Sequence, residues 1–126
     1  MKTSSKITIV LLALIFFVAP MGYYFYYSNT PGKLDGFATC LKDKGATFYG
    51  AYWCPHCLRT KAMFGVSAKK LPYVECSLPN QGGQNQTCND KGITGYPTWI
   101  FADGSRLSGE HTLPELAAKT SCTLPK

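Results

Sequence analysis

The pattern of apolar and polar positions separates a long apolar run from a remainder with short, alternating periods. From Ile7 to Tyr27 no charged residue interrupts a stretch that is apolar and then rich in aromatics. As a helix, this run would be about 31 Å long, which matches the hydrocarbon core of a bilayer. We therefore predict a transmembrane signal anchor over residues 7–27, which attaches the chain to a membrane.

The charges on either side of the run predict its orientation. Lys2 and Lys6 lie before it, in residues 1–6, whereas the first charged residue after it is Lys33. Positive charge favours the cytoplasmic side of a membrane. We expect residues 1–6 to be cytoplasmic, residues 28–33 to be a short linker, and the rest to be extracytoplasmic in a single-pass cell-membrane protein.

A cleaved signal peptide is the alternative interpretation of the apolar run. Cleavage would then fall near residues 19–22, where Pro20 is unfavourable close to the cut. Both interpretations export the domain that follows.

Beyond the linker, apolar residues recur at helical spacing in some segments and form short aromatic-rich runs in others. The expected elements are a helix over Leu34–Lys44, a strand over Ala46–Trp53, a helix from Pro55 to about Lys70 bent at Gly65, a strand over Pro72–Cys76, a loop over 78–84, a weak helix over Gln84–Lys91, a strand over Thr98–Phe101, a turn at Asp103–Gly104 leading into a strand over Ser105–Ser108, and a helix over Thr112–Thr120. This alternation predicts an α/β fold over residues 34–126, with a four-stranded mixed sheet flanked by helices.

The composition indicates an oxidising compartment and argues against a nucleic-acid partner. Six cysteines in a chain of 126 residues favour an oxidising environment. The net charge is +6, but Lys69-Lys70 is the sole Lys/Arg doublet of the predicted domain and has no aromatics interleaved with it. We therefore expect no nucleic-acid partner.

The candidate chemistry lies in Cys54-Pro55-His56-Cys57, which follows a predicted strand and opens a predicted helix. A helix N-terminus carries free N–H groups and a partial positive charge, which favour the thiolate of Cys54. His56 adds a donor or a positive charge, and Pro55 suits the first helical turn. We expect Cys54 to be the exposed nucleophile and Cys57 to lie one turn deeper, where it closes or resolves a disulfide.

A cysteine pair with this spacing also occurs in zinc sites and in structural disulfides. A zinc site would need further ligands, and the chain has no second CxxC and no HxxxH. A permanently closed structural disulfide is the other alternative. We expect no metal, and no cofactor beyond the redox-active disulfide Cys54–Cys57.

A second signal lies at Gly95-Tyr96-Pro97-Thr98, immediately before a predicted strand. A proline at the start of a strand, after a glycine and an aromatic residue, is a candidate for a cis bond. The alternative is an ordinary trans-proline turn.

With these motifs the chain resembles the thioredoxin superfamily, and more narrowly the thioredoxin-like domain that accompanies bacterial homologues of vitamin K epoxide reductase. The matching segments are FYGAYWCPHC (48–57), LPYVEC (71–76), Cys88 and KGITGYPTW (91–99). The CPHC tetrad is also similar to that of the periplasmic oxidant DsbA. The resemblance implies that the loop at Pro97 lies against the CxxC, and that Trp53, Tyr96 and Pro97 contact a bound peptide.

The resemblance also implies partners: exported cysteine-containing proteins, and a membrane quinone reductase of the DsbB or vitamin K epoxide reductase kind. Two departures matter. Thioredoxin has a buried acid where this chain has Phe48, which argues against a general reductase. The sequence also contains no fused four-helix reductase domain, so we expect a separate membrane protein to reoxidise the centre.

Four cysteines remain. A Cys76–Cys88 bridge would tether the glycine-rich loop between them, and the resemblance supports this pair. Elimination then pairs Cys40 with Cys122. In a thioredoxin fold, the helices near these two residues tend to lie on opposite faces of the sheet, so two buried or free thiols are the alternative.

The function expected is therefore a membrane-anchored thiol–disulfide oxidoreductase that donates disulfides to exported proteins. A membrane-tethered reductase or isomerase has the same sequence features, because the direction depends on the reduction potential. A non-enzymatic holdase that uses the groove beside Pro97 is the third hypothesis. It does not explain the second cysteine of the CxxC.

Overall fold

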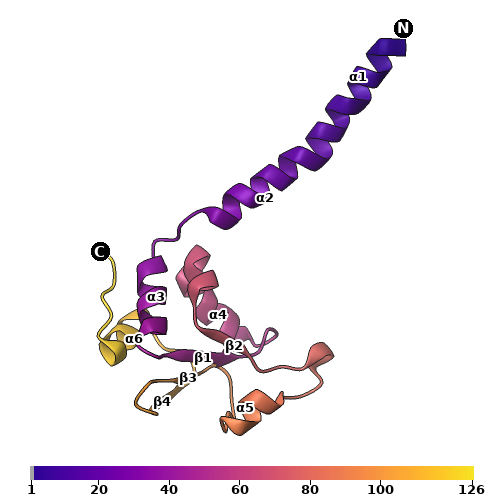
Figure 1. Cartoon of the computed structure of the whole chain (residues 1–126). Coiled ribbons are helices and arrows are strands. Elements are labelled where there is room, and N and C mark those ends of the chain that lie inside the picture. Colours follow the sequence, from indigo (N-terminus) through magenta and orange to yellow (C-terminus); the bar gives the residue numbers. More distant parts are fainter. Residues whose placement is uncertain (1) are drawn as a thin grey trace. The chain divides into compact units, whose positions relative to one another are not determined.

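The computed structural model describes residues 2–126; Met1, part of the predicted segment 1–6, lies outside the described residues. The chain divides into two compact units, the second of which comprises Gly32–Lys126 (Figure 1).

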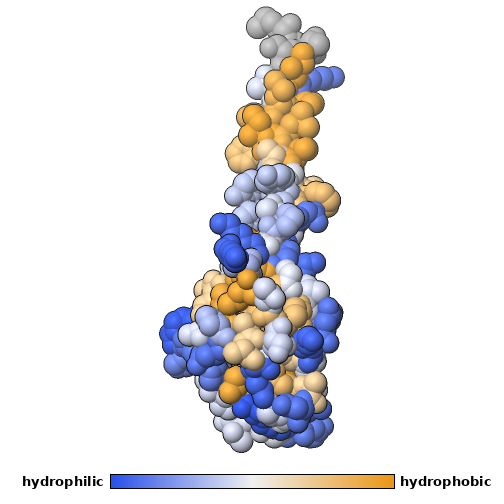
Figure 2. All heavy atoms as spheres, turned by 90° about the vertical axis from the view of Figure 1, so that its left-hand side faces the viewer, coloured by the Kyte–Doolittle hydropathy of each residue, from blue (hydrophilic) through white to orange (hydrophobic). Residues whose placement is uncertain are grey.

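The first unit is helical and apolar. It consists of α1 (Lys2–Ala13), a π-helical segment (Leu14–Val18) and α2 (Ala19–Asn29). The stretch Lys6–Asn29 has 24 residues, and an 18-residue window within it has a mean hydropathy of 2.2. Its side chains are exposed, and Figure 2 shows hydrophobic spheres along much of the helix. By length and composition it can cross a membrane, and a signal sequence has the same properties. The predicted apolar helix is thus present.

The second unit is an α/β fold whose elements follow the predicted order. They are α3 (Asp35–Asp43), β1 (Thr47–Gly50), α4 (Pro55–Phe64), a 3₁₀ segment (Gly65–Lys70), β2 (Tyr73–Glu75), a 3₁₀ turn (Pro79–Gln81), α5 (Gln86–Asp90), β3 (Thr98–Ile100), β4 (Arg106–Ser108) and α6 (Leu113–Thr120). The strands form one sheet in the order β2-β1-β3-β4, with β1 parallel to β2 and antiparallel to β3. The predicted four-stranded mixed sheet is confirmed.

The sheet buries its two faces against different partners. Phe48 and Trp99, paired across β1 and β3, point into the larger core with residues of α3, α4 and α6. Tyr49 points the other way, into a smaller cluster with Cys88 of α5. Figure 1 shows α3 and α4 on one side of the sheet and α5 on the other. This alternation follows from the two-residue period of a strand.

The position of α3 corrects one expectation. The helices near Cys40 and Cys122 do not lie on opposite faces, because Phe37 of α3 and Leu116 of α6 belong to the same core cluster. Phe37 also stacks on Phe64 of α4, with ring centroids 5.9 Å apart. The three helices α3, α4 and α6 therefore share one face.

Most predicted boundaries agree with the structure to within two residues, but the first strand is shorter than predicted. It ends at Gly50 rather than Trp53, because the chain turns there and the Cys54 N–H donates to the Ala51 carbonyl at 3.0 Å. This turn carries the chain from the end of β1 to the start of α4.

Candidate active site

The CxxC begins α4. Cys54 is the N-cap residue, with extended backbone, and Pro55 occupies the first turn, where its missing N–H costs no helical hydrogen bond. The Cys54 carbonyl accepts from the Leu58 N–H at 3.0 Å. Cys54 and Cys57 are both free thiols, whereas the other four cysteines form disulfides. The Cys54 sulfur thus lies at the positive end of the helix.

Both thiols are buried, and for Cys54 this differs from the exposed position predicted for it. Cys54 is 5% exposed and Cys57 is 1% exposed, so the expectation of an exposed Cys54 is wrong, although it remains the more accessible of the two. One cause is the loop before β3, whose Tyr96 carbonyl lies 3.7 Å from the Cys54 sulfur and accepts a weak S–H hydrogen bond. Burial raises the pKa of the Cys57 thiol to about 12.

His56 belongs to a charged cluster on the exposed side of α4. Its Nδ1 lies 2.5 Å from the Glu110 Oε1 and 2.7 Å from the Arg59 Nη2. Arg59 also donates to that same oxygen, from Nε at 2.8 Å and from Nη2 at 2.5 Å. Hydrogen bonds from Arg59 and His56 lower the pKa of the Glu110 carboxyl. This cluster attaches the segment after β4 to the active-site helix.

The loop before β3 lies beside the CxxC. Its Tyr96–Pro97 peptide bond is cis, and Pro97 is fully buried. The Trp53 ring meets the Tyr96 ring edge-on, with centroids 6.1 Å apart, and the Trp53 indole N–H donates to the Ser77 hydroxyl at 2.8 Å. Trp53 is 42% exposed, so this aromatic pair presents apolar surface next to the cysteines.

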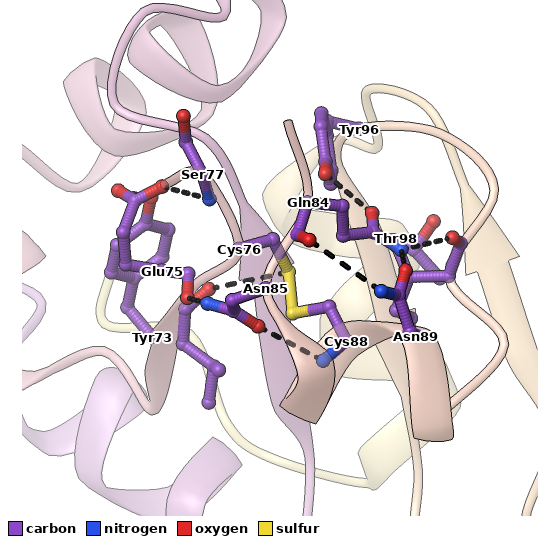
Figure 3. Close-up of a disulfide and its surroundings, with 12 residues drawn as sticks. Tyr73, Glu75, Cys76, Ser77, Gln84, Asn85, Cys88, Asn89, Tyr96 and Thr98 are labelled. Atoms are coloured by element: carbon purple, nitrogen blue, oxygen red, sulfur yellow. Dashed lines mark hydrogen bonds between the residues drawn. A yellow bond between two sulfur atoms is a disulfide. The ribbon is translucent and has the colours of Figure 1, made fainter. Parts of the chain in front are cut away.

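The Cys76–Cys88 disulfide closes a segment that contacts this loop. Cys76 and Cys88 are joined, with Cα atoms 5.6 Å apart, and both are fully buried (Figure 3). Gln84 lies between these cysteines in the sequence. Its Oε1 accepts a hydrogen bond from the Tyr96 hydroxyl, and its Nε2 donates to the Ile93 carbonyl at 2.8 Å. The bridged segment thereby holds the side chain of Tyr96 in place.

The remaining cysteine pair ties the ends of the domain together. Cys40 of α3 is joined to Cys122, which follows α6, with Cα atoms 5.9 Å apart. The two residues are 82 positions apart in the chain. Within the described part of the chain, no three His, Cys, Asp or Glu side chains are grouped to hold a metal.

Sequence reasoning missed Arg59 and Glu110. Glu110 is 54 residues from His56, in a segment with no recognisable motif, so no pattern pointed to it. Arg59 is three residues after His56 and shares its helix face, which is a usable signal once the helix is predicted.

Together, the sheet and the paired thiols at a helix N-terminus define a thioredoxin-like protein with a redox-capable cysteine pair. No family model matches the chain. Over 89 residues, or 67% of this chain, it is 47% identical to the thiol-disulfide oxidoreductase LTO1 of Arabidopsis thaliana. The chain spans 23% of that protein's length. The chain is therefore a homologue of a thiol-disulfide oxidoreductase.

Proposed function

We propose that this chain is a membrane-anchored oxidant that donates the Cys54–Cys57 disulfide to cysteine-containing exported proteins. The observation that carries the proposal is the position of Cys54 as N-cap of α4. The helix N-terminus stabilises the Cys54 thiolate, which is present only in the reduced protein. A stabilised reduced state makes the disulfide a better oxidant.

The reaction proceeds by two exchanges. A substrate thiolate attacks the Cys54 sulfur, the Cys54–Cys57 bond breaks, and Cys57 leaves as a thiolate. A second substrate thiolate then attacks the substrate sulfur of the mixed disulfide and releases the Cys54 thiolate. The substrate gains a disulfide, and the two electrons it loses remain on Cys54 and Cys57. The apolar surface of Trp53 and Tyr96, together with Pro97, is where the substrate backbone binds.

Reoxidation needs an acceptor for those two electrons. The resemblance to domains that accompany vitamin K epoxide reductase homologues favours a quinone-linked membrane partner of that kind or of the DsbB kind. An anchor over residues 7–27, with residues 1–6 cytoplasmic, would attach the domain 34–126 to the membrane on its extracytoplasmic side. The exported substrates of this domain are on the same side.

The reduction potential tests the direction of transfer. In the detergent-solubilised full chain, equilibrated with glutathione buffers, we expect a potential closer to about −120 mV, typical of DsbA, than to about −270 mV, typical of thioredoxin. We expect the charge of His56 to favour the reduced dithiol, so His56→Ala should lower the potential by about 30 mV, a tenfold change in the equilibrium constant. His111→Ala, at the other histidine, is the control and should change it little. A wild-type value near thioredoxin's, or no effect of His56→Ala, would favour the reductase instead.

The anchor is tested by membrane extraction. Because the run from Ile7 to Tyr27 is uncharged, predominantly apolar and exposed, the full-length protein should remain in the membrane pellet after carbonate or high-salt washing. Intact-mass measurement of the pellet should give the uncleaved chain. Recovery of a soluble form that begins near residues 19–22 would instead show a cleaved signal peptide.

A further inference from the structure

In the mechanism above, the Cys57 thiolate has no positively charged partner, although a backbone hydrogen bond from Ala51 lowers the Cys57 pKa. The first exchange requires this residue to leave as a thiolate, and the reverse of that exchange requires it to attack as one, yet it is 1% exposed, and burial raises its pKa to about 12. Thioredoxins carry a buried acid nearby, and here that position is Phe48. The groups that surround Cys57 therefore decide how readily its thiolate forms.

Gly50 shows what lies next to the Cys57 sulfur. A Cβ on this glycine would come within 2.8 Å of the Cys57 Sγ and 3.0 Å of the Tyr73 Cε2. The thiol and the edge of the Tyr73 ring thus lie against the same backbone position of β1. Any side chain at Gly50 would push one of them away.

Tyr73 is held in a network with two charged residues. The Lys61 Nζ lies 3.3 Å from the centroid of the Tyr73 ring, a cation–π contact. The Tyr73 hydroxyl donates to the Glu75 Oε2 at 2.6 Å. Tyr73 and Glu75 are two residues apart on β2, so they point to the same face of the sheet, the face that α4 covers.

Both ends of this network are positioned by the backbone. Lys61 is four residues after Cys57 on α4 and so lies one turn further along the same helix face. The other carboxylate oxygen of Glu75 accepts from the backbone N–H groups of Ser77 at 2.8 Å and Tyr52 at 3.2 Å. Figure 3 shows Glu75 between Tyr73 and Ser77. The Lys61 ammonium is therefore kept over a ring that is itself fixed and whose edge lies against the same backbone position as the Cys57 sulfur.

We propose that Lys61, held over the Tyr73 ring, is the positive charge that stabilises the Cys57 thiolate. The inference rests on the proposed dithiol–disulfide function. When a substrate thiolate breaks the Cys54–Cys57 bond, the electron pair stays on Cys57 opposite the Lys61 ammonium. In the reverse direction, Cys57 loses its proton to solvent, attacks the Cys54 sulfur of a mixed disulfide and displaces the substrate thiolate.

The other ionisable groups around Cys57 act against its thiolate or stay neutral. The Cys54 thiol on the same helix raises the Cys57 pKa, whereas Lys61 lowers it. Burial raises the pKa of Tyr73 on β2, and also that of Tyr96 in the loop before β3, so both phenols stay neutral at physiological pH. The Glu75 carboxylate accepts hydrogen bonds from the Tyr52 N–H, the Tyr73 hydroxyl and the Ser77 N–H.

The test separates attack by Cys54 from attack by Cys57. Full-length protein whose CxxC has been selectively reduced is mixed with 5,5′-dithiobis(2-nitrobenzoate) in a stopped-flow instrument. Attack by Cys54 releases one thionitrobenzoate and leaves the other half bound to Cys54. Attack by Cys57 then closes the Cys54–Cys57 disulfide and releases the second thionitrobenzoate, at a rate independent of reagent concentration.

Lys61→Met keeps most of the side-chain stem and removes the charge. It should slow the second release about tenfold at pH 7 and move the midpoint of that step's pH profile up by about one unit, because one pKa unit is a tenfold change in thiolate. The first release should change less than about twofold. Lys61→Arg should restore the second release to within about threefold of wild type. Lys91→Met, at an exposed lysine after α5, is the matched control and should change neither step.

An unchanged second release in Lys61→Met would overturn the inference while leaving the proposed function intact. A slower second release with an unmoved pH midpoint, or one that Lys61→Arg does not restore, would also overturn it, since packing alone would then explain the defect. If wild type gave no second release, the dithiol function itself would fail.

Discussion

Cys57→Ala is expected to trap exported proteins on Cys54 as stable mixed disulfides. In this variant the lone Cys54 thiolate attacks a disulfide of the exported protein, one sulfur of that disulfide joins Cys54, and the other leaves as a thiolate. In the wild type, the mixed disulfide is short-lived because Cys57, on the next turn of α4, can attack it. Without Cys57 this attack cannot occur. The rate of disulfide transfer should fall at least about 10³-fold, since enzymes typically exceed the uncatalysed rate by more than that. Non-reducing electrophoresis of membranes should show higher-mass species that dithiothreitol dissolves, and mass spectrometry should place the linkage at Cys54.

Cys54→Ala is the matched control. It should lose turnover to the same extent but trap nothing, because Cys57 is 1% exposed and an external substrate cannot reach its sulfur. Trapping by Cys54→Ala and not by Cys57→Ala would reverse the roles assigned to the two cysteines. Equal trapping by both would mean that the helix N-terminus does not select the nucleophile.

The fold and the CxxC were predictable because their signals are local. The aromatic run ending near Gly50, the cysteine at the N-cap and the proline after it occupy consecutive positions and require no knowledge of tertiary contacts. The same holds for Thr112, whose side chain caps α6 in a capping box with Glu115. Local propensity and period identified each of these elements, with errors of one to three residues at their ends.

What the sequence could not predict depends on contacts between distant segments. The placement of α3 on the face shared by α4 and α6 follows from how Phe37, Phe64 and Leu116 pack together, and no periodicity records which face a helix covers. The attachment of Glu110 to His56 joins residues 54 positions apart. The reduced accessibility of Cys54 has the same origin, since the Tyr96 carbonyl that lies against it is 42 residues away.

The lysine beside Cys57 illustrates the same limit. The spacing of Cys57 and Lys61 places them on one helix face, and the spacing of Tyr73 and Glu75 places them on one strand face. Each pair can be read from the sequence separately. That the two faces meet follows from the packing of α4 on the sheet, and only then does the lysine come to lie over the tyrosine ring, whose edge shares a backbone position with the buried thiol.

Removing the Cys40–Cys122 bridge should destabilise the domain more than removing Cys76–Cys88. The first bridge spans 82 positions and the second 12, so loop-closure entropy gives about 4.5 and about 2.8 kcal/mol. Cys40→Ala/Cys122→Ala should therefore lower the melting temperature by roughly 18–36 °C, at about 4–8 °C per kcal/mol for a domain of this size. Thermal unfolding followed by circular dichroism, with Cys76→Ala/Cys88→Ala as the paired comparison, measures both. Each double variant leaves no unpaired structural thiol. A larger loss from the Cys76–Cys88 pair would show that packing around these two buried residues outweighs chain entropy.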